Sequence, residues 1–334
     1  MRPSGIGGQA VMEGVMMKNQ ETYAVAVRKP NGEIDVDVQT YGENSRCKKL
    51  RTIPFIRGVF NFIDSLVLGT RVLTYSASFF DDEEEEPKAE KEEKDSNGWF
   101  QRNKDSILMG LTVCFSLVMS IGIFFCIPFF VTEFFRKYVT QSEGIIVAIE
   151  GVLRIAIFLG YIVLISCMKD IQRFFMYHGA EHKCINCIEH GMELNVENAR
   201  KSSRQHKRCG TSFLLIVMVI SIIFLFFIRA ENRWIRLAIR LALIPVIAGV
   251  SYEFIRLAGR SENRLVNILS KPGMWLQNLT TREPLDEMLE VAIASVEAVF
   301  DWKSFLEGKS PKDCACATVT EKADGEDGHA EAGI

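Results

Sequence analysis

The chain of 334 residues alternates between long apolar runs and segments rich in charge. Four of the apolar runs are long enough to cross a bilayer, for which about 20 residues are needed. They cover residues 107–132, 145–168, 212–228 and 237–255. The pattern therefore predicts a mainly α-helical multi-pass membrane protein of the cell membrane, with about four spans and the lipid bilayer as its surroundings.

The first 52 residues have a different pattern, in which short apolar stretches are separated by turn residues. Residues 22–28 and 33–40 have the composition of strands, and Asn31-Gly32 lies between them. An Asn-Gly pair between two such stretches is a strong hairpin signal. We therefore predict a small N-terminal β hairpin, preceded by a glycine-rich motif at residues 5–17 that forms a tight turn beside a short strand.

Residues 53–80 predict an amphipathic helix, on which Arg57, Asp64 and Arg71 recur every seven residues and share a face. This helix could lie in the membrane interface or pack against the spans, because three charges disfavour it as a span of its own. The acidic run that follows, residues 81–98, has a composition that predicts disorder.

After the last span, residues 256–306 are amphipathic, and apolar positions at helical spacing predict a helix over residues 285–305. Residues 307–334 are small and polar, so we expect disorder there. The loop between the second and third spans, residues 169–211, holds eight Lys or Arg residues, against two between the first and second spans. By the positive-inside tendency, this loop and both termini are predicted to be cytoplasmic.

Candidate chemistry is concentrated in this loop, which holds four of the five histidines of the chain. His178, Glu181 and His182 form the pattern His-x-x-Glu-His. If residues 169–177 continue the second span as a helix, the two imidazoles share a face and can hold one divalent metal, for which zinc is the expected ion. Glu181 would then activate a water molecule as a general base.

A metal held by two histidines needs further ligands from elsewhere in the chain. Glu253 is the best downstream acid, because it lies at one end of a predicted span, and Glu13 is a second candidate. The sequence contains no nucleotide-binding loop, dinucleotide fingerprint or serine elbow, so the substrate stays unknown.

Two other interpretations of the same segment are open. Cys184-x-x-Cys187 and His206-x-x-Cys209 have the spacing of two zinc knuckles, and a metal held there would order the loop without chemistry. In the other interpretation there is no metal, and the basic cluster at residues 200–208 contacts lipid phosphates.

Five motifs resemble those of the bacterial YqhQ-type membrane proteins, and the likeness runs from about residue 7 to residue 300. The motifs cover residues 7–17, 54–59, 178–183, 208–213 and 280–284. The resemblance implies a family of unknown function that is often labelled a predicted metal-dependent enzyme. The positions that match its motifs are His178, Glu181, His182, Cys187, His206, Cys209 and Glu253.

Two functions from different classes are therefore predicted. The first is a metal-dependent hydrolase in which His178 and His182 bind the metal and Glu181 activates water. The second is a non-enzymatic membrane scaffold, whose basic cytoplasmic loop binds a protein complex, an RNA-containing particle or anionic lipid, with any metal being structural.

Overall fold

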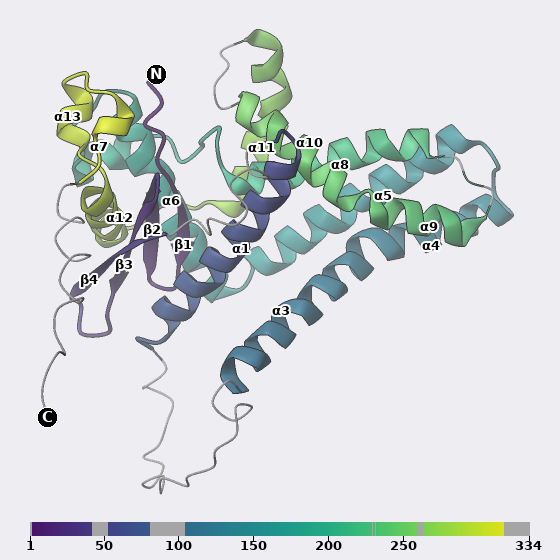
Figure 1. Ribbon diagram of the computed structural model, residues 1–334, viewed down its shortest axis with the longest axis horizontal. Coiled ribbons are helices and arrows are strands. Elements are labelled where there is room, and N and C mark those ends of the chain that lie inside the picture. The colour runs from purple at the N-terminus through teal and green to yellow at the C-terminus, as the bar shows by residue number, and fades with distance from the viewer. Residues whose placement is uncertain are drawn as a thin grey trace, which may run out of the picture. The chain divides into compact units, whose positions relative to one another are not determined.

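The computed structural model of the chain describes residues 2–41, 53–80, 104–228, 230, 232–258 and 263–316. These residues form two compact units, each described by itself below (Figure 1). The sheet unit takes its residues from 1–82, 164–215 and 249–334, and the helical unit takes its residues from 83–163 and 216–248. The predicted acidic run at 81–98 and residues 317–334 of the tail lie outside the described residues.

The sheet unit is built on a four-stranded antiparallel sheet with the strand order β1-β2-β3-β4. The strands are β1 (Gly7–Val11), β2 (Gly14–Asn19), β3 (Thr22–Arg28) and β4 (Ile34–Thr40). The predicted hairpin is confirmed as β3 and β4, in which Arg28 pairs with Ile34 next to the turn. The glycine-rich motif forms a second hairpin, β1 and β2, which was not predicted because glycine is depleted in strands.

Helices cover both faces of this sheet. They are α1 (Ile56–Ala77), α6 (Lys169–Glu189), α7 (Val196–Lys201), α12 (Asp286–Val299) and α13 (Trp302–Leu306). A further helix of the sheet unit, α11 (Arg264–Thr280), contacts His206 through Gln277. On one face, Ala24 and Ala26 of β3 pack in a core with α6 and α12 (Figure 1). On the other face, Val25 and Val27 pack against α1. Successive strand residues point to opposite faces, so the apolar run of β3 fills both cores.

The C-terminal segment differs from the prediction in two respects. The predicted helix over residues 285–305 is divided into α12 and α13, because Phe300 is extended and pairs with Ala315 in an isolated β-bridge. The N–H of Asp301 donates to the carbonyl oxygen of Cys314 at 2.9 Å, and Cys314 is buried. The expected disorder is therefore wrong for residues 307–316, which fold back onto α12 and α13.

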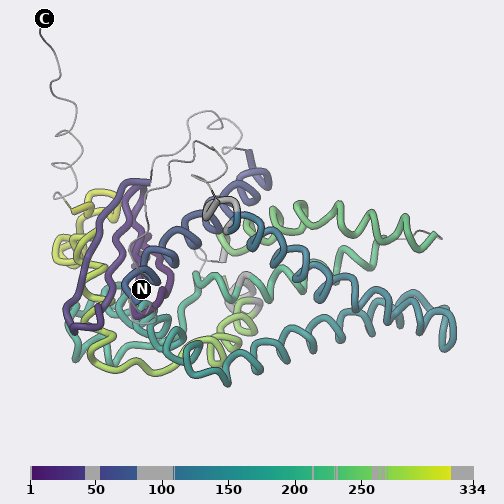
Figure 2. The backbone as a smooth tube through the Cα atoms, turned by 90° about the horizontal axis from the view of Figure 1, so that it is seen from below, coloured from purple at the N-terminus to yellow at the C-terminus, as the bar shows by residue number. Residues whose placement is uncertain are grey.

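The helical unit contains α3 (Lys104–Ile121), α4 (Ile127–Tyr138), α9 (Arg233–Ala242) and most of α5 (Glu143–Ser166) and α8 (Gly210–Phe227). A π-helical turn at Gly122–Cys126 joins α3 to α4, so that the two run on as one helix (Figure 2). Among the described residues, three helices are long and apolar enough to cross a membrane. They are Gly110–Tyr138, Glu143–Ser166 and Gly210–Phe227.

The fourth predicted span is bent. Its residues form α9 and α10 (Ile244–Ala258), which meet at an angle of 40°. By length and composition the pair is either a broken span or a re-entrant segment. The described part of the chain thus has three or four helices that suit a bilayer, in place of four unbroken spans.

The sequence predicted that the second apolar helix continues to the histidines, but in the structure it does not. α5 ends at Ser166, Met168 is extended with φ −75° and ψ 132°, and α6 begins at Lys169 as a new helix. The side-chain amide of Gln172 donates to the carbonyl oxygen of Ser166 at 3.1 Å, which satisfies one of the free carbonyls at the end of α5. The helix that carries the histidines is therefore an element of the sheet unit.

Candidate metal centre

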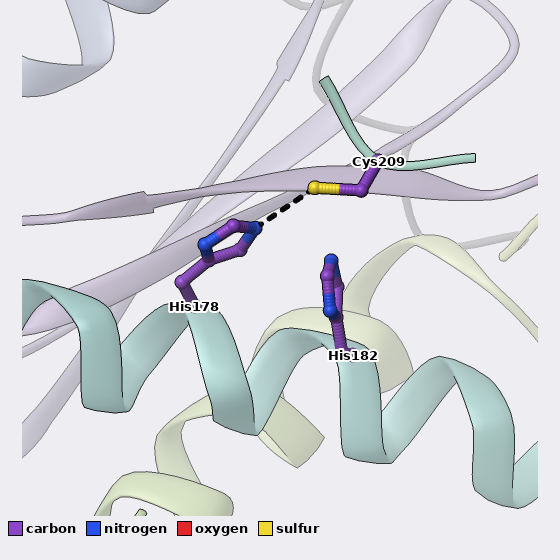
Figure 3. A group of neighbouring side chains, drawn as sticks. All are labelled: His178, His182 and Cys209. Carbon is purple, nitrogen blue, oxygen red and sulfur yellow. Dashed lines mark hydrogen bonds between the residues drawn. The ribbon is translucent and has the colours of Figure 1, made fainter. Parts of the chain in front are cut away.

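Two histidines and one cysteine come together in the sheet unit. His178 and His182 lie one turn apart on α6, and their ring centroids are 4.4 Å apart. Cys209, in the loop before α8, completes a group whose three ligand atoms all lie within 4.8 Å of one another. Figure 3 shows both rings on the same side of α6, with the sulfur of Cys209 facing them. Imidazole nitrogens and a thiolate sulfur are ligand types by which proteins hold zinc, copper and other transition metals.

Each imidazole is oriented by a main-chain carbonyl group. Nδ1 of His178 lies 2.9 Å from the carbonyl oxygen of Thr280, and Nδ1 of His182 lies 2.6 Å from that of Arg204. A carbonyl oxygen only accepts hydrogen bonds, so Nδ1 of each ring carries a proton. In the neutral ring Nε2 is then the free ligand atom, and this arrangement is usual for histidines that bind a metal.

The charges of the group also suit a metal. Nε2 of His178 lies 3.2 Å from Sγ of Cys209. Burial opposes ionisation of Cys209, but His178 and His182 outweigh it and hold the pKa of the thiol well below its usual range. Burial would likewise lower the pKa of His178, yet the Cys209 thiolate raises it to about 9. The two imidazoles therefore favour the thiolate form of Cys209, which is the form that binds metals.

The loop that carries Cys209 is held in place by Gln277 of α11. The side-chain amide of Gln277 donates to the carbonyl oxygen of His206 and to Oγ of Ser212, both at 2.7 Å. Its oxygen accepts from the N–H of His206 at 2.8 Å. All three bonds are buried, so the backbone on both sides of Cys209 is fixed before any metal arrives.

The carbonyl of Thr280 reaches His178 because α6 passes very close to the segment after α11. At Gly179, an added Cβ atom would collide with the carbonyl oxygen of Arg282. The N–H of Arg282 donates to the carbonyl oxygen of Phe175 at 2.9 Å, which joins the two segments directly. Any larger residue at position 179 would push the two segments apart, so the contact between Thr280 and His178 requires glycine there.

Glu181 faces a cavity of about 800 Å³, which is also lined by His178, His182 and Cys209. The Glu181 side chain is 5% exposed, and none of the described residues forms a hydrogen bond with it. Burial raises the pKa of its carboxyl group, although the two imidazoles act in the opposite direction. Gly8 of β1 leaves room for this carboxyl, because a Cβ there would lie 3.0 Å from its Cδ atom. Volumes of this size are typical of small-molecule sites.

The two acids predicted as further metal ligands lie elsewhere. Glu253 of α10 accepts two hydrogen bonds from Arg57 of α1, at 2.6 and 2.5 Å. Glu13, at the turn between β1 and β2, accepts two from Arg173 of α6, both at 2.5 Å. Each carboxylate therefore joins two elements through an arginine, and the structure does not bring either one into the group.

The two zinc knuckles are not brought together either. Cys184 is fully buried in the hydrophobic core, and the thiol of Cys187 donates to a main-chain carbonyl at 3.3 Å. Nε2 of His206 lies 3.4 Å from a carboxylate oxygen of Glu189. Of these four candidates, Cys209 alone belongs to the described group.

Some contributors to the centre were not found from the sequence. They are the carbonyl groups of Thr280 and Arg204, the glycines at positions 8 and 179, and the wall that α1 gives to the cavity. The motifs at residues 7–17 and 280–284 indicated that these segments matter, but the motifs did not show that the segments would contact the two histidines and Glu181.

A family model described as "Protein of unknown function (DUF1385)" matches residues 53–302 of this chain. The chain is also 37% identical, over 297 residues, to "Uncharacterized protein YqhQ" of Bacillus subtilis (strain 168). That alignment covers 88% of this chain and 91% of the relative. No solved structure matches the chain. With the motifs and both matches in agreement, the chain belongs to the DUF1385 family, the YqhQ-type proteins of unknown function.

Proposed function

We propose that this protein is a metal-dependent hydrolase of the cell membrane, with zinc held by His178, His182 and Cys209 and with Glu181 as the general base. One observation carries the proposal. The three donor atoms and the Glu181 carboxyl group all line one cavity of about 800 Å³. A purely structural site has no need of a cavity or of a neighbouring carboxyl group without a hydrogen-bond partner.

The number of donors favours a catalytic site over a structural one. Structural zinc sites have four protein ligands, whereas catalytic sites have three and leave one position open. Three donors come together among the described residues. A zinc ion bound by them would supply Lewis acidity and lower the pKa of a water molecule at the open position.

Residues of the chain would then orient the metal ligands and transfer the proton. The carbonyl groups of Thr280 and Arg204 keep both rings in the tautomer that offers Nε2. Glu181 accepts a proton from the attacking water and returns it to the leaving group. Burial favours this role, because it moves the pKa of the carboxyl upward from its usual value and towards neutral pH. We place the site on the cytoplasmic side, in keeping with the basic loop around it.

The scaffold function has less support. Four of the five basic side chains at residues 200–208 are paired with acids of the same unit. The pairs are Arg200 with Asp286, Lys201 with Glu197, Arg204 with Glu283 and Arg208 with Glu189. Each pair reduces the positive charge that the loop can offer to RNA, an acidic protein surface or anionic lipid.

The test uses the full-length protein, purified in detergent and loaded with zinc. Elemental analysis should find one zinc ion per chain in the parent protein and in Glu181→Gln, and almost none in Cys209→Ser. A panel of chromogenic esters, phosphoesters and amides is then screened for hydrolysis. Glu181→Gln should lower any activity found by about 10²- to 10⁴-fold, the usual contribution of a general base.

Cys187→Ser is the matched control, because Cys187 is also a buried thiol but lies outside the group. It should keep both zinc and activity. Parent protein without zinc would refute the metal centre. Full activity in Glu181→Gln with zinc retained would favour a structural metal and the scaffold function.

A further inference from the structure

Helix α1 has two unlike faces. The side that lines the cavity carries Asn61, Asp64, Ser65 and Leu68. The other side carries large apolar side chains that are between 36% and 52% exposed. They are Ile56, Ile63, Leu66, Val67 and Leu73. At about 100° per residue the two sets lie on opposite sides of the helix, so one helix separates the cavity from an apolar surface.

The orientation of α1 is fixed by glycines. A Cβ atom at Gly58 would lie 2.8 Å from Cβ of Tyr252, and one at Gly69 would lie 2.8 Å from the side-chain oxygen of Gln9. The helix is therefore packed closely against β1 and α10 along the side that carries Gly58 and Gly69. Rotating α1 to hide the apolar side chains would break both close approaches. Soluble proteins rarely leave such a row of large apolar side chains in water.

Chain connectivity indicates what covers this apolar surface. Cys209 is followed directly by α8, and α6 begins three residues after the end of α5. Both α5 and α8 are long and apolar enough to cross a membrane. Since consecutive Cα atoms are about 3.8 Å apart, Cys209 lies within a few ångströms of where a spanning α8 would begin. The candidate metal centre thus belongs at the surface of the bilayer.

The cavity itself suits an amphiphile. Apolar side chains such as Phe174 and Leu68 line it together with polar ones such as Asn61 and Gln20. Its volume of about 800 Å³ is enough for a head group and its linkage, whereas long acyl chains would have to remain outside. A bilayer next to α1 would offer a place for such chains.

We propose that α1 lies in the membrane surface with its apolar side among the acyl chains, and that the cavity behind it admits the polar head of a membrane-borne amphiphile. The inference rests on the proposed function, because the metal centre would act on that head. It narrows the substrate class to lipid-linked molecules with a hydrolysable bond near the head group.

The test places the photoreactive residue p-benzoylphenylalanine at single positions of the full-length protein. Val67 on the apolar side, Ser65 on the cavity side and Val36 on β4 as a control are each replaced. All three side chains are solvent-exposed, so the fold should tolerate the change. The protein is reconstituted in vesicles of phosphatidylcholine that contain an alkyne-labelled phosphatidylcholine, illuminated, and analysed for lipid adducts by mass spectrometry.

We expect several-fold more lipid adduct at positions 67 and 65 than at position 36. Adducts should join the acyl chains at position 67 and the head-group region at position 65. Absence of adducts at position 67, or covalent dimers there in place of lipid adducts, would overturn the membrane position of α1. Adducts at position 67 without any at position 65 would overturn the access of amphiphiles to the cavity.

Zinc content is measured on the same samples, which separates this inference from the proposed function. Lipid adducts at both positions without zinc would leave an amphiphile-binding cavity and refute the hydrolase. One zinc ion per chain without lipid adducts would leave the metal centre and refute the amphiphile.

Discussion

Both units bury carboxylates, and two of these, Glu150 and Glu181, are held in opposite ways. In the helical unit, the carboxylate of Glu150 accepts hydrogen bonds from Arg154 at 2.8 Å and from Arg240 at 2.7 Å. In the sheet unit, Glu181 has no such partner among the described residues, and it faces a cavity lined by three residues that could hold a metal ion. The first carboxylate is fully engaged within its unit, whereas the second is available to a ligand.

The difference helps to separate a charge that stabilises helix packing from one that is proposed to perform chemistry. The guanidinium group of Arg154 stacks 4.7 Å from the ring centroid of Phe125, and that of Arg240 lies 5.0 Å from that of Phe129. These contacts tie α5 and α9 to the joined helices α3 and α4. Burial and charge alone would therefore have marked both clusters as functional, and only the pairing distinguishes them.

The largest effect is expected in the helical unit. Glu150→Gln removes the counter-charge of two buried arginines, and such a loss costs about 3–5 kcal/mol of stability. Thermal unfolding of the full-length protein in detergent should show this as a strongly lowered midpoint. Zinc content per folded molecule should not change, because no residue of the cluster belongs to the metal-binding group.

The matched control is Glu143→Gln. Glu143 also pairs with an arginine, Arg136, but its side chain is 54% exposed. Exposed pairs contribute at most about 1 kcal/mol, so the midpoint should move little. Equal losses in Glu150→Gln and Glu143→Gln would contradict the assignment of the buried cluster to helix packing.

The next largest effect, on zinc affinity, is expected where Gly179 of α6 packs against the segment that orients His178. Gly179→Ala would push the carbonyl of Arg282 away from α6 and move the neighbouring carbonyl of Thr280, which orients His178. Disturbing such an orienting group typically lowers metal affinity by about 10- to 100-fold. Competition with a zinc chelator measures this. Gly160→Ala, at a helical glycine with open space around it, is the control and should bind zinc like the parent.

A smaller effect is expected from pH. The pKa of His178 is raised to about 9 and that of Cys209 is lowered, so at pH 8 the metal-free centre holds an imidazolium next to a thiolate. Zinc must displace one proton from His178, and its affinity should rise about tenfold per pH unit between pH 7.5 and 8.5. The rise should end above about pH 9. An affinity that stays constant across this window would contradict the pairing of His178 with Cys209.

The same pair has an effect of opposite sign on the metal-free protein. A folded-state pKa above that of an unfolded histidine stabilises the fold at low pH. This contribution of His178 is fully present below the unfolded value and is lost as the pH rises through about 9. The lowered pKa of Cys209 contributes with the opposite sign and is gained as the pH rises towards about 8.5, the usual value of a thiol, so the two contributions nearly cancel in the intact pair. Unfolding of the metal-free protein should therefore depend little on pH between about pH 7 and 8.5, and a steep dependence there would contradict the pairing of His178 with Cys209.

The smallest effect on zinc is expected from Glu253→Gln. Its carboxylate holds α1 through Arg57 and lies outside the metal-binding group, so zinc content should stay at the parent value. A loss of zinc in this variant, measured by elemental analysis, would restore Glu253 as a ligand. The variant also sharpens the comparison, since it removes a carboxylate that is paired within the sheet unit itself.

Much of the architecture could be predicted from the sequence. The apolar helices and the hairpin of β3 and β4 depend on local pattern, and both are present. The first hairpin was missed because glycines at positions 7, 8 and 14 hide the strand pattern. The end of α5 was missed because Met168 leaves helical geometry without a proline or glycine to signal it.

The sequence by itself determined how residues close together in the chain are placed relative to one another. The four-residue spacing of His178 and His182 makes their rings converge on any α-helix, because 3.6 residues complete a turn. Tertiary structure alone decided which distant group joins them. Gln277 holds the loop of Cys209 against the two rings, while Arg57 engages Glu253 elsewhere. Contacts between residues so far apart leave no periodic trace in a single sequence, since packing and not backbone geometry sets them.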